Sequence, residues 1–485
     1  MKSDVKKYFL EAVGKDKNEL SKKNPYRDIG FDADKRRLGW VKPPKFSEIK
    51  KSFKELLPAL LGKENFIFIG MGGSINGIKP LISLFKAKSF YILANLDPEA
   101  LLKVVSQIKN FRKTLVVAIS KSGTTKETQL LSHALKELFS NKLGDNKWQE
   151  HFLWLSDKIA FEKIDTLGWK GVKKATIQFN GGSDIGGRFS SPHTLIFYLP
   201  LFLLLNKNLA TLGKIHTTFA KIQKEIQKKA YLISQDCKSK TDAYFSPFLD
   251  EKLNNSLSSW VVQLFQESLG SKLDNLAVKT IPSFKDRQFF SVKLDLEIKD
   301  SRTYLMAQMY FFQVFIAYYS ASKKINFVTQ NFVENYKKEM QKLENKNNRC
   351  QNNKVLEFNS IIEQVKKRIK NNHRFIEIVL YFYPSCSKIT DNIKKEFSKN
   401  FPDKEILIFV GSDWNHQSYQ AAFGSKDTFY LLLTSPQYRH DVLAVPRDII
   451  LKNIKTQLVI AQATYLTLKD KAFIFALKDI NKLEN

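Results

Sequence analysis

Residues 117–128 read Val-Ala-Ile-Ser-Lys-Ser-Gly-Thr-Thr-Lys-Glu-Thr. The apolar run that ends at Ile119 predicts a buried parallel strand, and helical spacing of apolar residues begins after Glu127. The turn between them combines hydroxyl groups with the free backbone N–H groups of a helix N-terminus, which favour an anion. Ser and Thr also cap helices, but a cluster this dense around a glycine favours a phosphate site. The hydroxyl side chains expected at the phosphate are Ser120, Ser122, Thr124 and Thr125.

A second turn of the same design lies upstream, at residues 70–74, with the sequence Gly-Met-Gly-Gly-Ser. It follows the apolar run 66–69 and precedes helical spacing from Ile78. Its glycines allow the backbone to approach a ligand closely. Because the turn lacks the third glycine of the dinucleotide fingerprint, the pattern does not favour a nucleotide site. We therefore expect two neighbouring parallel strands whose carboxyl ends converge on a phosphorylated ligand.

Strand and helix patterns alternate along most of the chain, which predicts an α/β fold with parallel sheets covered by helices on both faces. We expect a helical N-terminal extension at 1–50, a first domain with both turns at 51–210, and a second domain with C-terminal helices at 211–485. The polar segment 344–354 is expected to be an exposed loop. The predicted strands are 66–69, 90–94, 114–119, 151–155, 174–179, 289–295, 375–383, 405–410, 428–433 and 472–477.

Composition is consistent with a soluble protein, and because no targeting segment is visible we expect it in the cytoplasm. The formal charge of +30 is spread along the chain, which favours attraction of an acidic substrate over a nucleic-acid surface. Three unclustered cysteines favour a reducing compartment without a disulfide framework or zinc site. The start shows no signal-peptide pattern. The most apolar run, 195–205, is shorter than the ~20 residues of a membrane span and predicts a core helix.

Four segments carry a family resemblance, in the family's order. The turns at 70–74 and 120–128 resemble the two phosphate-binding signatures of glucose-6-phosphate isomerases. Residues 186–190, Gly-Gly-Arg-Phe-Ser, and 260–270, which contain Glu267, resemble two further signatures. The two turns alone would indicate only a sugar-isomerase (SIS) domain, and the other segments narrow the resemblance to the isomerase.

The C-terminal half is most similar to the isomerase portion of the fused transaldolase/glucose-6-phosphate isomerases. Residues 325–337 keep the spacing from Gln330 to Lys337, and residues 411–420 keep a histidine, His416, with a glutamine four residues later. The resemblance implies two SIS-type doubly wound parallel-sheet domains, each a three-layer α/β/α sandwich. It also implies reversible conversion of glucose 6-phosphate to fructose 6-phosphate through a cis-enediol, without metal or cofactor, in a homodimer.

The resemblance also implies residue roles. Glu267 would move the proton between C2 and C1, and Arg188 would stabilise the enediolate. His416 and Lys337 would open the sugar ring, with the histidine supplied by the partner subunit. The residues expected to bind the substrate are Gly73, Ser74, Ser120, Lys121, Ser122, Thr124, Thr125, Glu127, Gln263 and Gln330.

Departures from the family pattern leave alternatives open. Ser271 stands where a lysine usually follows the glutamate signature, and the residues around His416 lack the usual Ser-Thr-Gly. The chain could therefore also accept mannose 6-phosphate, or bind a sugar phosphate as a non-catalytic sensor. An aminosugar-phosphate isomerase is disfavoured because no glutaminase-like segment is visible.

Overall fold

The computed structural model describes residues 4–32, 35–144, 147–237, 244–273, 276–278, 280, 290–330, 332–345, 353–478 and 480–483. The chain folds into two compact units, each assembled from separate stretches of sequence. Unit 1 comprises Met1–Ile92, Arg112–Thr125 and Gln149–Gln330. Unit 2 comprises Leu93–Phe111, Lys126–Trp148 and Asn331–Asn485.

Unit 1 is built on a parallel sheet with the strand order β4-β3-β5-β6-β7. Every residue of β5 is buried, as expected for a strand covered on both faces. The connections after β3 and β5 leave toward opposite edges of the sheet, so the topological switch point lies between these two strands. The strands are β3 (Asn65–Ile69), β4 (Phe90–Leu93), β5 (Thr114–Ile119), β6 (Phe152–Ser156) and β7 (Lys173–Thr176).

The remaining strands of unit 1 form a short ribbon and a small sheet. Strands β1 (Phe31–Asp32) and β2 (Lys35–Arg36) pair antiparallel. Strands β8 (Tyr244–Pro247), β9 (Ala277–Val278) and β10 (Phe290–Val292) form a parallel sheet in the order β10-β8-β9.

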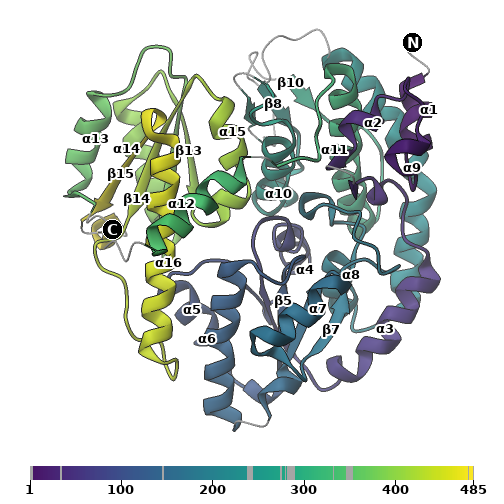
Figure 1. Cartoon of the computed structure of the whole chain (residues 1–485), viewed down its shortest axis with the longest axis horizontal. Coiled ribbons are helices and arrows are strands. Elements are labelled where there is room, and N and C mark those ends of the chain that lie inside the picture. The colour runs from purple at the N-terminus through teal and green to yellow at the C-terminus, as the bar shows by residue number, and fades with distance from the viewer. Residues whose placement is uncertain are drawn as a thin grey trace. The chain divides into compact units, whose positions relative to one another are not determined.

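Helices supply most of the rest of unit 1. Helix α11 is almost entirely buried and packs along α9, as Figure 1 shows. Buried aromatic side chains fill this region, including Trp40, which stacks on Phe189 with ring centroids 4.9 Å apart. The helices are α1 (Asp4–Glu11), α2 (Tyr26–Ile29), α3 (Phe46–Leu60), α4 (Lys79–Phe85), α7 (Phe161–Ile164), α8 (Leu195–Leu204), α9 (Leu209–Cys237), α10 (Glu251–Leu269) and α11 (Ser301–Lys323).

Unit 2 is built on a second parallel sheet, with the strand order β11-β15-β14-β12-β13. Every residue of the central strands β12 and β14 is buried, so both faces of the sheet are covered. Alternate residues of these strands, such as Ile378 and Leu431, join one apolar cluster with α13 and α14. In Figure 1, α16 lies on the other side of the sheet.

The strands of this second sheet are β11 (Val355–Leu356), β12 (Phe375–Tyr381), β13 (Glu405–Val410), β14 (Thr428–Thr434) and β15 (Ala472–Leu477). The helices of unit 2 are α5 (Pro98–Val105), α6 (Lys126–Leu143), α12 (Val333–Asn345), α13 (Phe358–Lys366), α14 (Ser387–Asn400), α15 (Tyr419–Gly424) and α16 (Arg447–Leu468).

The predicted α/β class with doubly wound parallel sheets is confirmed. Residue 289 of the strand predicted at 289–295 lies outside the described residues. Of the rest, only 290–292 form a strand, β10, which pairs with β8 in unit 1 rather than joining the second large sheet. The compact units also divide the chain differently from the boundaries at 50 and 210, because α5 and α6 pack with unit 2 while 211–330 packs with unit 1. Within the predicted loop 344–354, residues 346–352 lie outside the described residues, and so does Cys350.

None of the helices in the described part of the chain is long and apolar enough to cross a membrane. The apolar run 195–205 largely forms α8, a buried helix, as predicted for a core segment.

Candidate functional site

The hydroxyl-rich turn occupies the residues between the end of β5 and the start of α6. Ser120 Oγ lies 2.9 Å from Thr125 Oγ1, and Ser122 Oγ lies 2.9 Å from Thr124 Oγ1. Gly123 has a φ of +67°, and an added Cβ would lie 2.6 Å from Ile164 Cγ1, so a side chain there would be both strained and crowded. The turn therefore curls tightly at the carboxyl edge of the sheet, next to the switch point of unit 1.

Lys121 attaches this turn to the segment that precedes Arg188. Its Nζ donates hydrogen bonds of 2.8 Å to the carbonyl oxygens of Ser183 and Ile185, and lies 3.7 Å from Asp157 Oδ2. Burial lowers the pKa of Lys121 to about 8, and the charge of nearby Arg37 contributes to that shift. Lys121 thus has a structural role in holding two loops of unit 1 together.

The glycine turn after β3 packs directly against the turn that carries Arg188. A Cβ added at Gly73 would lie 2.3 Å from the carbonyl oxygen of Gly187 and 2.7 Å from the backbone nitrogen of Arg188. Ser74, the last residue of the same turn, is half-buried. Only a residue without a side chain at position 73 permits this approach of the two backbones.

Arg188 and Glu267 form a buried ion pair. Arg188 Nη1 lies 3.3 Å from Glu267 Oε1, and the side chains are almost fully enclosed. Arg188 Nε donates to Ser268 Oγ at 2.8 Å, and Nη2 donates to the carbonyl oxygen of Phe327 at 2.6 Å. Burial lowers the pKa of Arg188, while the carboxylate of Glu267 opposes that shift. The guanidinium and carboxylate are therefore fixed in position within unit 1.

A chain of side-chain amides continues from this pair toward α4. Gln263 lies one turn before Glu267 on α10, and its Nε2 donates to Glu267 Oε2 at 2.9 Å. Asn76 Nδ2 in turn donates to Gln263 Oε1 at 3.0 Å, and Lys79 Nζ donates to Asn76 Oδ1 at 2.6 Å. Both carboxylate oxygens of Glu267 thus have a partner, and Gln263 is oriented from both ends.

Lys272 is a site residue that sequence reasoning missed. Its Nζ donates to the carbonyl oxygens of Asn326 and Thr329, the latter at 3.1 Å. Burial lowers its pKa to about 7, with the charge of Arg188 acting in the same direction and that of Glu267 opposing it. The signal was present in the sequence, since Lys272 is one residue beyond Ser271, where the family pattern has its lysine.

In unit 2, His416 pairs with Glu127. His416 Nε2 lies 2.9 Å from Glu127 Oε1, joining the turn after β13 to the first turn of α6. Burial alone would lower the pKa of His416, but Glu127 and Asp413 outweigh it and raise the pKa above the usual 6.5. Burial alone would raise the pKa of Glu127, but the charge and hydrogen bond of His416 outweigh it and lower the pKa below 4.5. Both shifts favour the charged forms, so the two side chains form an ion pair when His416 is protonated.

Lys337 lies near this pair. Its side chain is 45% exposed and Nζ lies 2.8 Å from Glu334 Oε1, yet its positive charge is close enough to act against the rise in the pKa of His416. Gln330, the last residue of unit 1, is half-buried. The site residues predicted from sequence thus divide into a set in unit 1 around Arg188 and a set in unit 2 around His416. In the described chain, no group of three or more His, Cys, Asp or Glu is arranged to hold a metal ion.

We expect the His416–Glu127 pair to stabilise the protein more at about pH 5.5 than at about pH 9. Because the pKa of folded His416 is raised above 6.5, its contribution is fully present below that value and is lost as the pH rises through the folded pKa. Because the pKa of folded Glu127 is lowered below 4.5, its contribution is fully present above that value and is lost as the pH falls. The thermal midpoints of the wild type and His416→Gln should therefore differ more at the lower pH.

The exposed His440→Gln variant is the control for this comparison, because it also removes an imidazole from unit 2. It should show no comparable change between the two pH values. An equal effect of His416→Gln at both pH values would contradict the ion-pair interpretation.

Residues 60–208 match the family model for phosphoglucose isomerase. This stretch contains both predicted phosphate-binding turns and Arg188, whereas Glu267 and His416 lie beyond it. The family match therefore includes both predicted phosphate-binding turns and Arg188 but not the predicted base or ring-opening residues.

Relatives of known function match a longer part of the chain. It is 31% identical over 241 residues to a glucose-6-phosphate isomerase of Thermus thermophilus, a match that covers 48% of this chain and 55% of that protein. It is 30% identical over 218 residues to the glucose-6-phosphate isomerase of Campylobacter jejuni, which covers 43% and 51%. The chain spans about half the length of these relatives. The predicted resemblance to this family is confirmed over the matched stretch.

A solved structure has a similar fold. It is a hypothetical protein, also from Thermus thermophilus, with a TM-score of 0.51 at 20% identity, and the match covers 70% of this chain and 94% of that chain. At this identity the likeness concerns the fold alone.

Proposed function

We propose that this chain is a glucose-6-phosphate isomerase, which interconverts glucose 6-phosphate and fructose 6-phosphate through a cis-enediol. The observation that carries the proposal is the buried pair of Glu267 and Arg188. The same unit holds the hydroxyl-rich turn at 120–125 and the glycine turn at 70–74, here called the phosphate-type turns, at the switch point of its sheet. The match of residues 60–208 to the phosphoglucose isomerase family supports the same reaction.

The proton transfer is assigned to Glu267. Its carboxylate takes the proton from C2 of the open-chain aldose, the C1–C2 double bond forms, and the electrons of the carbonyl bond move onto O1. Transfer of the O2 proton to O1 and return of the proton on Glu267 to C1, with formation of the C2 carbonyl bond, give the ketose. A carboxylate oriented by Gln263 and enclosed from water suits such a transfer.

Arg188 is assigned to the negative charge that develops on the enediolate oxygens. Its guanidinium is positioned by Ser268 and Phe327 before any substrate arrives, so little reorganisation accompanies the reaction. Removal of one such preorganised donor commonly costs about 3–4 kcal/mol of transition-state stabilisation.

The phosphate is assigned to the turn at 120–125 and to the glycine turn with Gly73 and Ser74. The hydroxyl pairs of the first turn can reorient from one another to phosphate oxygens, because each hydroxyl can both donate and accept. Lys121 supports this turn through the backbone at Ser183. Gln263 and Gln330 are assigned to the sugar hydroxyls.

Ring opening is assigned to His416 and Lys337, which exchange a proton with the ring oxygen and the anomeric hydroxyl. The raised pKa of His416 favours its protonated form, which suits the acid in that step. We further propose that the enzyme works without metal or cofactor as a homodimer in the cytoplasm, with a sugar phosphate and no nucleic acid as its partner.

The test is an assay of the conversion of fructose 6-phosphate to glucose 6-phosphate, in which a coupled dehydrogenase reports the glucose 6-phosphate formed. Turnover that depends on enzyme concentration is the expected result. Binding of fructose 6-phosphate by calorimetry without turnover would overturn the isomerase proposal and indicate a sugar-phosphate sensor instead. Mannose 6-phosphate in the same assay decides whether the substrate range is broader.

A further inference from the structure

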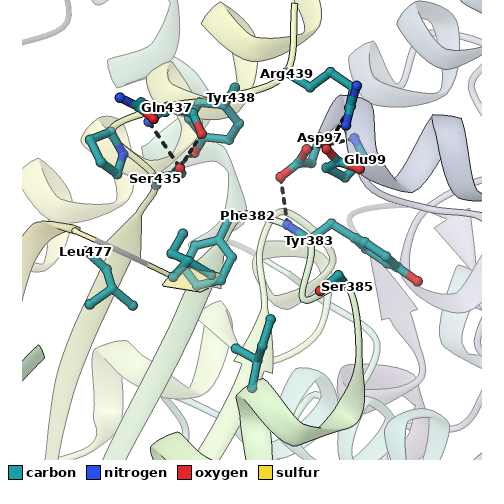
Figure 2. Close-up of a pocket in the computed structure, with 13 residues that line it drawn as sticks. Asp97, Glu99, Phe382, Tyr383, Ser385, Ser435, Gln437, Tyr438, Arg439 and Leu477 are labelled. Carbon is teal, nitrogen blue, oxygen red and sulfur yellow. Dashed lines mark hydrogen bonds and ion pairs between the residues drawn. The ribbon is translucent and has the colours of Figure 1, made fainter. Parts of the chain in front are cut away.

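Unit 2 has a pocket at the carboxyl ends of its central strands, with a volume of about 460 Å³ (Figure 2). Its walls come from the segments that follow β12 and β14, from the end of β15, and from the start of α5. The polar groups that line it are Asp97, Glu99, Ser385, Ser435, Gln437 and Arg439, and the aromatic ones are Phe382, Tyr383 and Tyr438. None of these residues belongs to the site described above.

The pocket lies at the topological switch point of the second sheet. After β12 the chain moves to β13 at one edge, whereas after β14 it moves to β15 on the other side. In open parallel sheets, ligands bind in the crevice that these diverging connections leave at the carboxyl ends of the strands. The phosphate-type turns of unit 1 occupy the equivalent place in the first sheet. The sheet topology therefore indicates a ligand site here, independently of the shape of the pocket.

Hydrogen bonds among the lining residues hold the walls of the pocket in place without a ligand. The backbone nitrogens of Tyr383 and Glu99 donate to the carboxylate of Asp97 at 2.7 and 2.9 Å. Arg439 Nε donates to Glu99 Oε1 at 2.7 Å, which joins the segment after β14 to α5. Figure 2 shows the bonds made by Asp97 and Arg439 at one side of the pocket. A site preorganised in this way loses little entropy when it binds a ligand.

The charges of the pocket disfavour a phosphate group. The carboxylates of Asp97 and Glu99 are balanced by the guanidinium of Arg439 and by Lys103, whose Nζ donates to the carbonyl oxygen of Ser385 at 3.3 Å and lies 5.3 Å from the centre of the Tyr383 ring, so no excess positive charge is left for an anion. Carboxylate oxygens accept hydrogen bonds from hydroxyl groups, and the guanidinium donates to them. The half-buried ring of Tyr383 adds an apolar face with a hydroxyl at its edge.

We propose that this pocket binds an uncharged polyhydroxylated molecule, either a free sugar or a sugar alcohol. Its hydroxyl groups would bond to the remaining lone pairs of Glu99 and to the guanidinium of Arg439. The carbon skeleton would pack on Tyr383. The proposal is independent of the isomerase reaction, because it uses none of the residues assigned to that reaction.

The experiment is calorimetric titration of the full chain with D-sorbitol, D-glucose and inorganic phosphate in separate runs. Binding of sorbitol or glucose is the expected result, and the comparison of the two distinguishes a sugar alcohol from a cyclic sugar. Tyr383→Ala should weaken this binding by about tenfold or more, because it removes the ring while keeping the backbone bond to Asp97. Ser122→Ala, in the phosphate-type turn, is the matched control and should leave the binding unchanged.

Arg439→Ala is the second variant, since Arg439 is exposed and lies outside the strands of the sheet. Arg439→Ala should also weaken polyol binding. If Tyr383→Ala does not fold, this variant tests whether the polyol binds in the pocket. Failure of the wild type to bind either polyol would overturn the proposal. Loss of polyol binding in Ser122→Ala would also overturn it, because the polyol would then bind in unit 1. Phosphate binding that is abolished by Arg439→Ala would overturn it as well, because the pocket would then be an anion site.

Discussion

Glu267→Gln is expected to lower the kcat of the isomerisation by about 100- to 10,000-fold, the range that a positioned general base contributes. The amide keeps the shape of the side chain and can still accept from Arg188, but it cannot take a proton from carbon. The variant also leaves the guanidinium of Arg188 without its charged partner in a buried setting, so some loss of stability is expected too. The assay is the coupled conversion of fructose 6-phosphate, with binding measured separately by calorimetry.

Two further variants separate the loss of the base from the loss of the ion pair. Glu267→Asp keeps the negative charge but withdraws the carboxylate by one methylene, so it should restore stability more than rate. Glu251→Gln changes an exposed glutamate at the other end of α10 and should leave both properties unchanged. Near-normal kcat in Glu267→Gln would show that another group moves the proton.

Gly73→Ala is expected to destabilise the protein by about 1–3 kcal/mol, the usual cost of inserting atoms into a packed interior. The added Cβ would lie 2.3 Å from the carbonyl oxygen of Gly187, so the backbone that carries Arg188 must move. Because misplacement of a catalytic group by about 1 Å can cost about 100-fold in rate, we expect a loss of that order. Thermal unfolding and the coupled assay measure the two effects.

Gly187→Ala provides the matched control for this variant. A Cβ at Gly187 would meet nothing within 4 Å, although the residue lies directly before Arg188 in the chain. The same glycine-to-alanine change should therefore be tolerated at 187 and harmful at 73. Equal effects at both positions would mean that the close approach of the two turns has no importance for the site.

The positions of individual strands and helices were largely predictable from the sequence. Residues 114–119 form β5 as predicted, and the helical spacing after Glu127 belongs to α6. The order of the strands was not predictable in the same way. Residues 290–292 of the strand predicted at 289–295 pair with β8, because pairing depends on which surfaces meet in space and not on the strand's own pattern.

By itself, the sequence determined the strand, the hydroxyl-rich turn and the helix at 114–143, because these elements are adjacent in the chain and their periodicity is local. The resemblance to the isomerase family then indicated Glu267 and Arg188 as candidate site residues. Only the tertiary structure decided that Arg188 pairs with Glu267, that Lys272 reaches the carbonyls at 326 and 329, and that His416 pairs with Glu127. These contacts join residues far apart in the chain, and they form because burial requires each polar group to find a partner, a condition that local sequence does not specify.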